Sequence, residues 1–209
     1  MIMKTGVIKL RRIFEQPIKL KTILSLVLFI GALFFLFDGF YIKAKAQYAQ
    51  YLIANSWSHY MNTGEHKKPW PWADTYPIAK LDMYETSQYV LSGASGRNLA
   101  FGPAHMLQTA SLGSPGNAAI AGHRDTHFEV LKNAQMGDLI YLTSRNPNSK
   151  TANSKQAYRV NQIEIVDQYN LDILEGTQDT TSITLITCYP FDSLEQNPSL
   201  RYVVKAQKI

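Results

Sequence analysis

The most apolar stretch of the chain lies near its N-terminus. Residues 23–37 are apolar except for Ser25 and Gly31, and the apolar character continues to residue 42. This length of roughly 20 residues matches the ~30 Å that a helix needs to cross the hydrocarbon core of a bilayer. Because the run has no polar face, it does not fit a buried helix of a soluble domain. We therefore predict a transmembrane helix over residues 23–42.

A second helix is predicted directly after the apolar run. Between residues 43 and 62, apolar and aromatic side chains recur at helix-like intervals among polar ones. The aromatic side chains suit either the membrane interface or the surface of a following domain, and we favour packing on the domain. Residues 63–72 contain Gly, Pro and charged residues and predict a non-helical linker. Residues 43–72 thus form a juxtamembrane helix and linker.

The pattern changes at about residue 73. From here on, short apolar segments alternate with clusters of Gly, Pro, Ser and Asn. The segments that predict β-strands are 79–83, 89–92, 105–107, 117–122, 138–143, 157–166, 182–188 and 201–206. Eight short strands at this spacing indicate a sandwich or a closed barrel. We expect one mainly β domain over residues 73–209, with a helical turn at 131–136 and a solvated hairpin loop at 146–155.

Charge is concentrated at the N-terminal end. The first 22 residues carry six Lys or Arg against one Glu, which accounts for the whole formal charge of +5 and leaves the rest neutral. We therefore expect no nucleic-acid partner. Under the positive-inside rule, the basic segment 1–22 stays in the cytoplasm and the chain after residue 42 is translocated. Residues 44–46 read Ala-Lys-Ala and offer an alternative, a cleaved signal peptide, but the apolar run is long for one and we favour an anchor.

Cys188 is the only cysteine of the chain, so it cannot form an intrachain disulfide. In an exported protein such a thiol is either an inert core residue or a reactive group. Side chains alternate along the predicted strand 182–188, so Cys188 faces the same side as Thr184 and Ile186. A proline two residues later ends the strand. If the next strand is its antiparallel neighbour, Arg201 begins that strand where Cys188 ends this one.

His123 follows another predicted strand, and the glycine before it leaves room around the imidazole. A thiol nucleophile needs a base or cation that favours the thiolate and a donor for the oxyanion. Histidine supplies the first and arginine the second. Cys188, His123 and Arg201 at separate strand ends thus form a minimal set for acyl transfer. Each residue taken singly also has an ordinary interpretation, since a lone cysteine is more often buried and structural.

Other polar residues beside His123 leave alternatives open. His127 lies four residues further on, and the two histidines together with Cys188 imitate a zinc site. The glycine and the strand before His123 argue against the helix that this spacing would need, so we expect no metal and no cofactor. His127 is instead expected to pack or hydrogen-bond nearby. Asp125 either orients His123 or braces Arg124.

Three separated segments together resemble one protein family. Residues 184–188 read Thr-Leu-Ile-Thr-Cys, which matches the Thr-Leu-x-Thr-Cys signature of sortases, membrane-anchored cysteine transpeptidases. Residues 120–128, Ile-Ala-Gly-His-Arg-Asp-Thr-His-Phe, are similar to the family's histidine segment in its class D-like form, and Arg201 stands where its arginine follows the cysteine. The resemblance covers roughly residues 73–209. Residues 70–74 (Trp-Pro-Trp-Ala-Asp) and 101–105 (Phe-Gly-Pro-Ala-His) resemble the proteobacterial branch called class GN.

This resemblance implies an eight-stranded sortase-type β-barrel and a role for each residue. Cys188 would attack the Thr–Gly carbonyl of a C-terminal sorting signal similar to Leu-Pro-x-Thr-Gly in a secreted protein, forming a thioester. His123 would protonate the departing amine, Arg201 would hold the substrate or the oxyanion, and Thr187 would help to position the peptide. An acceptor amine of unknown identity would resolve the thioester. The implied location is the bacterial cytoplasmic (inner) membrane, crossed once with the N-terminus inside and the barrel in the periplasm.

Three other functions fit part of this pattern. An L,D-transpeptidase also uses an extracytoplasmic cysteine, but its Ser-His-Gly-Cys context is absent here. A cysteine peptidase differs only in that water resolves the thioester. A non-catalytic, membrane-tethered β-domain that binds partners would carry an inert Cys188.

Overall fold

The computed structural model describes residues 19–145 and 153–209. The chain divides into two compact units, Met1–Gln47 and Tyr48–Ile209. Most of the basic segment expected at residues 1–22, and most of the hairpin loop expected at 146–155, lie outside the described residues.

A single helix, α2 (Leu20–Thr63), contains both helices that the sequence predicts. No proline lies within it, and the alanines and lysines that follow residue 42 favour helix, so nothing ends the helix there. The apolar side chains between residues 20 and 42 are exposed, and this part is long and apolar enough to cross a membrane. A helix of this kind fits a single-pass membrane anchor.

The last turns of α2 belong to the second unit and pack on its barrel. Ile53 is 1% exposed and lies in an apolar cluster with Leu91 and Ala104. Trp57 packs against Tyr89, with ring centroids 6.1 Å apart. Packing on the domain is therefore confirmed for this tryptophan, whereas the rings of Tyr48 and Tyr51 are exposed.

Polar contacts hold the same helix turns in place. Gln50 Nε2 donates to the carbonyl of Phe101 at 2.7 Å. At the helix end, Arg145 Nη1 donates to the carbonyls of Tyr60 and Met61 at 3.0 and 3.2 Å. The last carbonyls of a helix have no partner within the helix, so a guanidinium from the barrel satisfies two of them.

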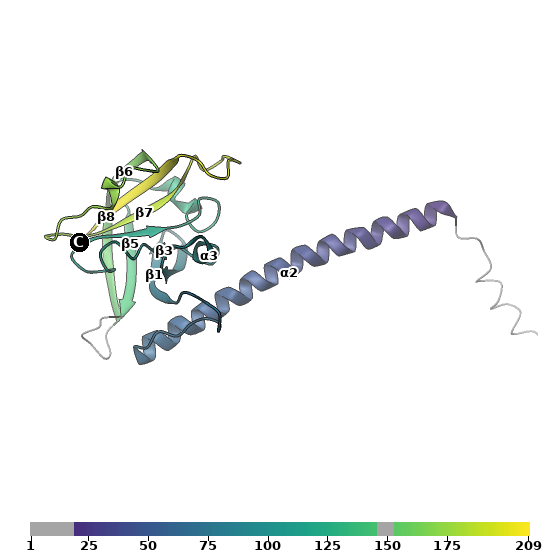
Figure 1. Cartoon of the computed structure of the whole chain (residues 1–209), viewed down its shortest axis with the longest axis horizontal. Helices are drawn as coiled ribbons and strands as arrows, with labels where there is room; N and C mark the ends of the chain where they lie inside the picture. Colours follow the sequence, from purple (N-terminus) through teal and green to yellow (C-terminus); the bar gives the residue numbers. More distant parts are fainter. Residues whose placement is uncertain (1–18, 146–152) are drawn as a thin grey trace, which may run out of the picture. The chain divides into compact units, whose positions relative to one another are not determined.

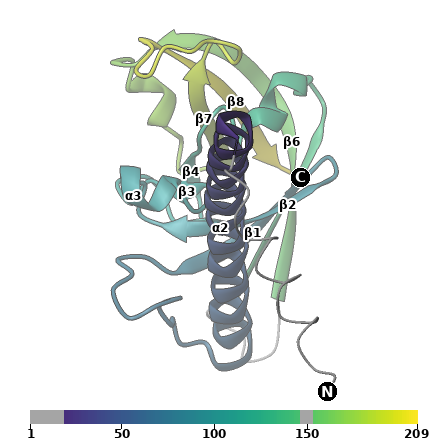
Figure 2. The ribbon, with the colours of Figure 1, turned by 90° about the vertical axis from the view of Figure 1, so that its right-hand side faces the viewer.

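Eight strands form the barrel. They are β1 (Pro77–Met83), β2 (Thr86–Ser92), β3 (Ala104–His105), β4 (Gly116–Ala121), β5 (Leu139–Arg145), β6 (Asn153–Asp167), β7 (Thr181–Tyr189) and β8 (Leu200–Lys208). The strand order is β1-β2-β3-β4-β7-β8-β6-β5, and β5 pairs with β1 to close the barrel. β6, β8 and β7 lie side by side, as both views show (Figures 1 and 2). The predicted mainly β fold, an eight-stranded barrel, is confirmed.

Each predicted strand segment coincides with a strand, but the shorter elements differ. β3 ends at His105, and the predicted continuation to residue 107 is wrong because the chain turns there. The helical turn expected at 131–136 is the 3-10 helix η1 (Glu129–Asn133). Two short helices were not predicted, α3 (Gly96–Leu99) and the 3-10 helix η2 (Asp172–Leu174). One turn of helix is too short to produce a hydrophobic period in the sequence.

Alternation along the strands separates two apolar clusters. Ile183 and Leu185 of β7 point into the barrel, where a core of sixteen buried residues fills the interior. Ile186 points outward and packs with Ala119, Val203 and Ile173 of η2 in a smaller cluster, which we call the outer cluster. Because η2 covers this part of the outer surface, both faces of β7 are buried near its centre.

Burial of the His105 imidazole predicts a pH-dependent stability. His105 is 5% exposed, and its Nε2 lies 2.9 Å from the carbonyl of Ala110. Burial lowers the pKa of His105, so between the folded and unfolded pKa values the unfolded state binds more protons. The stabilisation is present above the ordinary pKa of about 6.5 and is lost as the pH falls below it. We expect the Tm to fall between pH 7.5 and 5.5, and less steeply in His105→Gln. The cost of the substitution itself is read at pH 8, and equal slopes in both proteins would contradict the prediction.

Removal of the Ile53 side chain tests the docking of α2. We expect Ile53→Ala to lower the free energy of unfolding of the barrel by about 2–5 kcal/mol, because it opens a cavity in a packed cluster. Tyr51→Ala, on an exposed position of the same helix, serves as the control. Thermal unfolding of the full chain in detergent measures both. Equal midpoints for the two variants would show that the helix does not stabilise the barrel.

Candidate active site

Cys188 lies next to the last residue of β7 and is partly exposed. Its side chain is on the same side of the strand as Thr184 and Ile186, which is the outer surface of the barrel, because Ile186 belongs to the outer cluster. The thiol therefore sits outside the barrel, two residues beyond the part of the strand that η2 covers. It is not enclosed in the core.

Arg201 is the residue directly opposite Cys188 on the neighbouring strand. β7 and β8 are antiparallel, and their register pairs Cys188 with Arg201, which confirms the strand neighbourhood expected from the sequence. Residues opposite one another in an antiparallel pair project to the same face of the sheet. Arg201 Nη1 donates to the carbonyls of Pro198 and Leu200 at 2.7 and 2.9 Å, and Nη2 donates to Gln168 Oε1 at 3.1 Å. The guanidinium is thus held in a defined plane.

His123 approaches from the other side of β7. β4 runs parallel to β7, with Ala121 opposite Ile186. The pairing continues one residue further, since Gly122 N donates to the carbonyl of Ile186 at 3.1 Å. The next residue, His123, is exposed, and counting on from the pair Ala121–Ile186 makes it the counterpart of Cys188. Cys188, Arg201 and His123 therefore lie on three adjacent chain segments at one end of the barrel.

Gly122 allows the chain to turn directly after His123. A Cβ at this glycine would lie 2.7 Å from the ring of Phe128, which is fully buried. Phe128 N donates in turn to the carbonyl of His123 at 2.9 Å. The absence of a side chain at residue 122 thus lets the Phe128 ring pack against Gly122 and close the turn.

Thr187, the residue before the thiol, is buried and its hydroxyl is engaged. Its Oγ1 donates to the carbonyl of Gly122 at 2.8 Å. This bond ties the end of β4 to the end of β7, between the cysteine and the histidine. The sequence analysis expects Thr187 to help position the peptide, and that role stays a prediction.

Two polar residues that the sequence analysis did not single out support this face. Asn117 Oδ1 accepts the hydroxyl of Thr184 at 2.7 Å, and its Nδ2 donates to the carbonyl of Ile173 at 3.1 Å, so it fastens η2 over β4 and β7. Gln168 holds Arg201. Asn117 could have been noticed as a polar residue within an apolar strand, whereas no signal in the sequence pointed to Gln168.

The histidine segment also contains His127, which is half-buried. Burial lowers the pKa of His127, and the neighbouring His123 lowers it further while Asp125 opposes this. Its carbonyl accepts Gln88 Nε2 at 2.6 Å. Of the alternatives left open for Asp125, the bracing of Arg124 has no support within residues 19–145 and 153–209, because the guanidinium of Arg124 donates to the carbonyls of Ser193 and Glu195 instead. In the same residues, no three His, Cys, Asp or Glu side chains are grouped as metal ligands.

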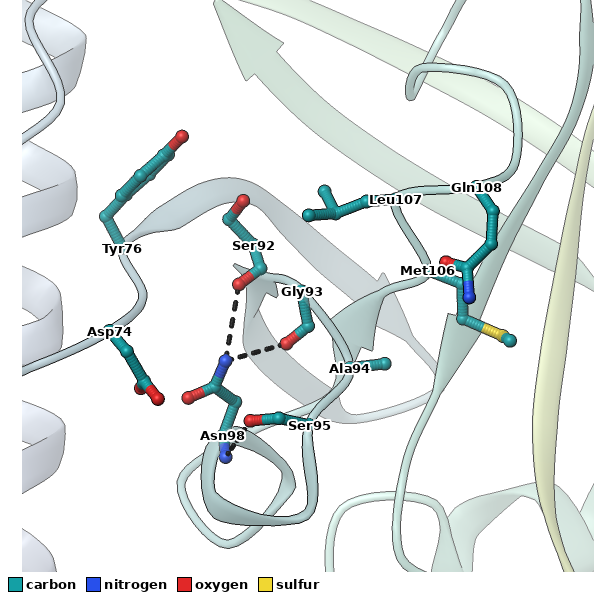
Figure 3. Close-up of a pocket in the computed structure, with 10 residues that line it drawn as sticks. All are labelled: Asp74, Tyr76, Ser92, Gly93, Ala94, Ser95, Asn98, Met106, Leu107 and Gln108. Carbon is teal, nitrogen blue, oxygen red and sulfur yellow. Dashed lines mark hydrogen bonds between the residues drawn. The ribbon is translucent and has the colours of Figure 1, made fainter.

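A cavity of about 490 Å³ lies elsewhere on the barrel, at the end of β2 (Figure 3). Asn98 lies at its edge and donates to the carbonyls of Ser92 and Gly93. Met106, one of its lining residues, also packs against the outer cluster, so the cavity borders the outer surface of the barrel. Cys188, His123 and Arg201 are not among the residues that line it.

Comparisons with known proteins agree with this architecture. A family model described as the sortase domain matches residues 78–209. Sortase D of Bacillus subtilis (strain 168) is 23% identical over 132 residues, which are 63% of this chain and 63% of that protein. The match thus spans less than two thirds of that relative's length.

Solved structures show the same fold. A sortase D5 transpeptidase from Clostridium perfringens superposes with a TM-score of 0.61 at 24% identity, covering 78% of this chain and 99% of that one. Sortase A from Corynebacterium diphtheriae gives a TM-score of 0.57 at 24% identity, covering 66% of this chain and 63% of that one.

The packing of Phe128 under Gly122 predicts the effect of one added methyl group. We expect Gly122→Ala to lower the free energy of unfolding by about 1–3 kcal/mol, since the buried ring cannot move away without strain. The same substitution at Gly96, where a Cβ meets no atom within 4 Å, is the control. Thermal unfolding compares the two. A Gly122→Ala protein as stable as the Gly96→Ala protein would refute the packing argument.

Proposed function

The chain belongs to the sortase family, and on this basis we propose that its barrel is a cysteine transpeptidase. It cleaves a C-terminal sorting signal similar to Leu-Pro-x-Thr-Gly in a secreted protein and passes the new acyl group to an amine. The observation that carries the proposal is the register of β7, in which Cys188 pairs with Arg201 while the adjoining end of β4 leads into His123.

The first half of the proposed reaction forms a thioester. The Cys188 thiolate attacks the carbonyl carbon of the Thr–Gly bond, and the carbonyl oxygen becomes an oxyanion. The C–N bond then breaks, and protonated His123 gives its proton to the departing glycine amine. The peptide up to threonine remains on the Cys188 sulfur.

The second half transfers the acyl group. Neutral His123 accepts a proton from the incoming amine as this amine attacks the thioester carbon. The C–S bond breaks, the new amide leaves, and the thiolate is regenerated beside protonated His123. The exposed position of His123 suits a group that must meet both a leaving and an incoming amine.

Arg201 is proposed to stabilise the oxyanion in both halves. Its two Nη1 hydrogens go to Pro198 and Leu200, and one Nη2 hydrogen goes to Gln168. A guanidinium has five N–H donors, so Nε–H and one Nη2–H are left for a substrate oxygen. Donors that are held in place before the reaction lose little energy to reorganisation when charge develops.

We propose the membrane arrangement that the sequence implies. Residues 23–42 span the bacterial cytoplasmic membrane, residues 1–22 remain inside, and the barrel of residues 73–209 works in the periplasm after a juxtamembrane helix and linker. The exposed apolar surface of α2 before residue 43 supports the span. We also propose that the chain belongs to class GN within the family.

A cysteine peptidase is the nearest alternative, because water in place of an amine would resolve the same thioester. Because the thiol is partly exposed, both water and an amine can reach a thioester formed on it. A non-catalytic β-domain is the further alternative, for which Cys188 would not react with a thiol probe at neutral pH. Addition of an amine acceptor separates the first two, since only a transpeptidase yields a ligated product.

Substitution of the three residues tests the mechanism. We expect Cys188→Ala and His123→Ala to abolish turnover of a sorting-signal peptide in a barrel that stays folded. Arg201→Lys keeps the charge but loses the planar fork, so we expect a loss of rate of at least about tenfold. Mass spectrometry of the thioester trapped with candidate peptides, and of the ligated product with an amine, measures each step.

The exposed Arg159 of β6 provides a matched control for the arginine substitution, as Arg159→Lys. Circular dichroism verifies that each variant is folded. Turnover retained by a folded Cys188→Ala protein would rule out the mechanism.

A further inference from the structure

The connection between β7 and β8 joins the strand of Cys188 to the strand of Arg201. It consists of residues 190–199, has no helix or strand, and is drawn in yellow in Figures 1 and 2. We call it the β7–β8 loop. One residue separates each of its ends from a residue of the proposed mechanism, Tyr189 on the side of Cys188 and Leu200 on the side of Arg201.

Arg124 holds the middle of this loop. Its Nη2 donates to the carbonyl of Ser193 at 2.8 Å and also to the carbonyl of Glu195. These partners are 69 and 71 residues away in the sequence, so the contact is purely tertiary. A hydrogen bond from a charged donor contributes more to stability than one between neutral groups.

The rest of the loop is fixed at its two ends. Near the start, Phe191 packs against Tyr202 of β8 with ring centroids 5.1 Å apart. Near the end, the carbonyl of Pro198 accepts Arg201 Nη1. Between these two points, Arg124 is the contact that joins the loop to the histidine segment.

Arg124 links the β7–β8 loop to the histidine segment because of its place in the sequence. Arg124 directly follows His123, whose carbonyl is held by Phe128. The Nη1 atom of Arg124 is buried without a hydrogen-bond partner within the described parts of the chain, so this side of the guanidinium is covered by protein. The β7–β8 loop is therefore joined to a segment whose backbone is itself held by Phe128.

We propose that Arg124 is a positioning residue that clamps the β7–β8 loop onto the histidine segment and thereby forms one wall of the peptide site. The clamp keeps the loop in place beside Cys188 and Arg201, while the backbone of His123 is held separately by Phe128. Leu194, between the two clamped carbonyls, is 99% exposed and is presented on the surface of this wall. The clamp itself is independent of the proposed function, whereas its role in the peptide site rests on that function.

Hydrogen exchange followed by mass spectrometry tests the clamp without any substrate. In Arg124→Met we expect the Glu195 amide, which donates to Ser193 Oγ within the loop, to exchange at least about tenfold faster, since a loss of 1.4 kcal/mol corresponds to a factor of ten. Arg124→Lys keeps the charge with a shorter reach and is expected to lie between Met and the native residue. Arg159→Met, at an exposed site on β6, is the control and is expected to leave the loop unchanged.

Kinetics then test the link to the peptide site. We expect Arg124→Met to raise KM for a sorting-signal peptide about tenfold or more, by the same reasoning, whereas alkylation of Cys188 by iodoacetamide keeps its rate. If Arg124 served stability alone, the substitution would lower the Tm but would not raise KM for the peptide while leaving the alkylation rate unchanged. If Arg124→Met does not fold, Arg124→Lys carries the same comparison.

The possible failures are distinguishable. Unchanged exchange of the Glu195 amide together with an unchanged KM would overturn the clamp. Faster exchange with an unchanged KM would overturn the wall of the peptide site. If the native chain turns over no sorting-signal peptide, the proposed function fails, and the exchange experiment still decides whether Arg124 holds the loop.

Discussion

The placement of the candidate site depends on backbone pairing along β7. This strand is hydrogen-bonded on one side to β4, in parallel, and on the other side to β8, in antiparallel orientation. A shift by one residue would turn Cys188 into the barrel. The shift would also take Ile183 and Leu185 out of the core and Ile186 out of the outer cluster. The apolar packing on both faces of β7 thus fixes which way the thiol points.

Local contacts around Gly122 extend this register into the turn after β4. The hydroxyl of Thr187 and the carbonyl of Ile186 both hold Gly122, and Phe128 occupies the space that a side chain at Gly122 would need. The histidine follows a backbone that is bound to β7 on one side and supported from below on the other. His123, the proposed general acid and base, can in this way be exposed and still keep a defined place.

Loops that connect the strands complete the surface around the thiol. η2 is fastened by Asn117 over β4 and β7, and the β7–β8 loop is held by two arginines, Arg124 and Arg201. Each loop is secured through main-chain carbonyls, and these bonds do not depend on the side chains of the loop residues. The scaffold can therefore hold loops of varied sequence, which is the usual arrangement for sites that recognise peptides.

Alternating and continuous apolar segments were enough to predict a long apolar helix followed by eight short strands, because burial on one face repeats with the period of each element. The chain order also predicted that Arg201 starts a strand opposite Cys188, since a short connection between consecutive strands favours antiparallel neighbours. Single helical turns such as α3 and η2 left no such period. The parallel pairing of β4 with β7, which brings His123 to the same end of the barrel as the thiol, joins segments that are far apart in the chain. The same holds for the bonds from Arg124 to Ser193 and from Arg201 to Gln168. No local pattern encodes these contacts, because they form only when the closed barrel brings distant strand ends to one rim.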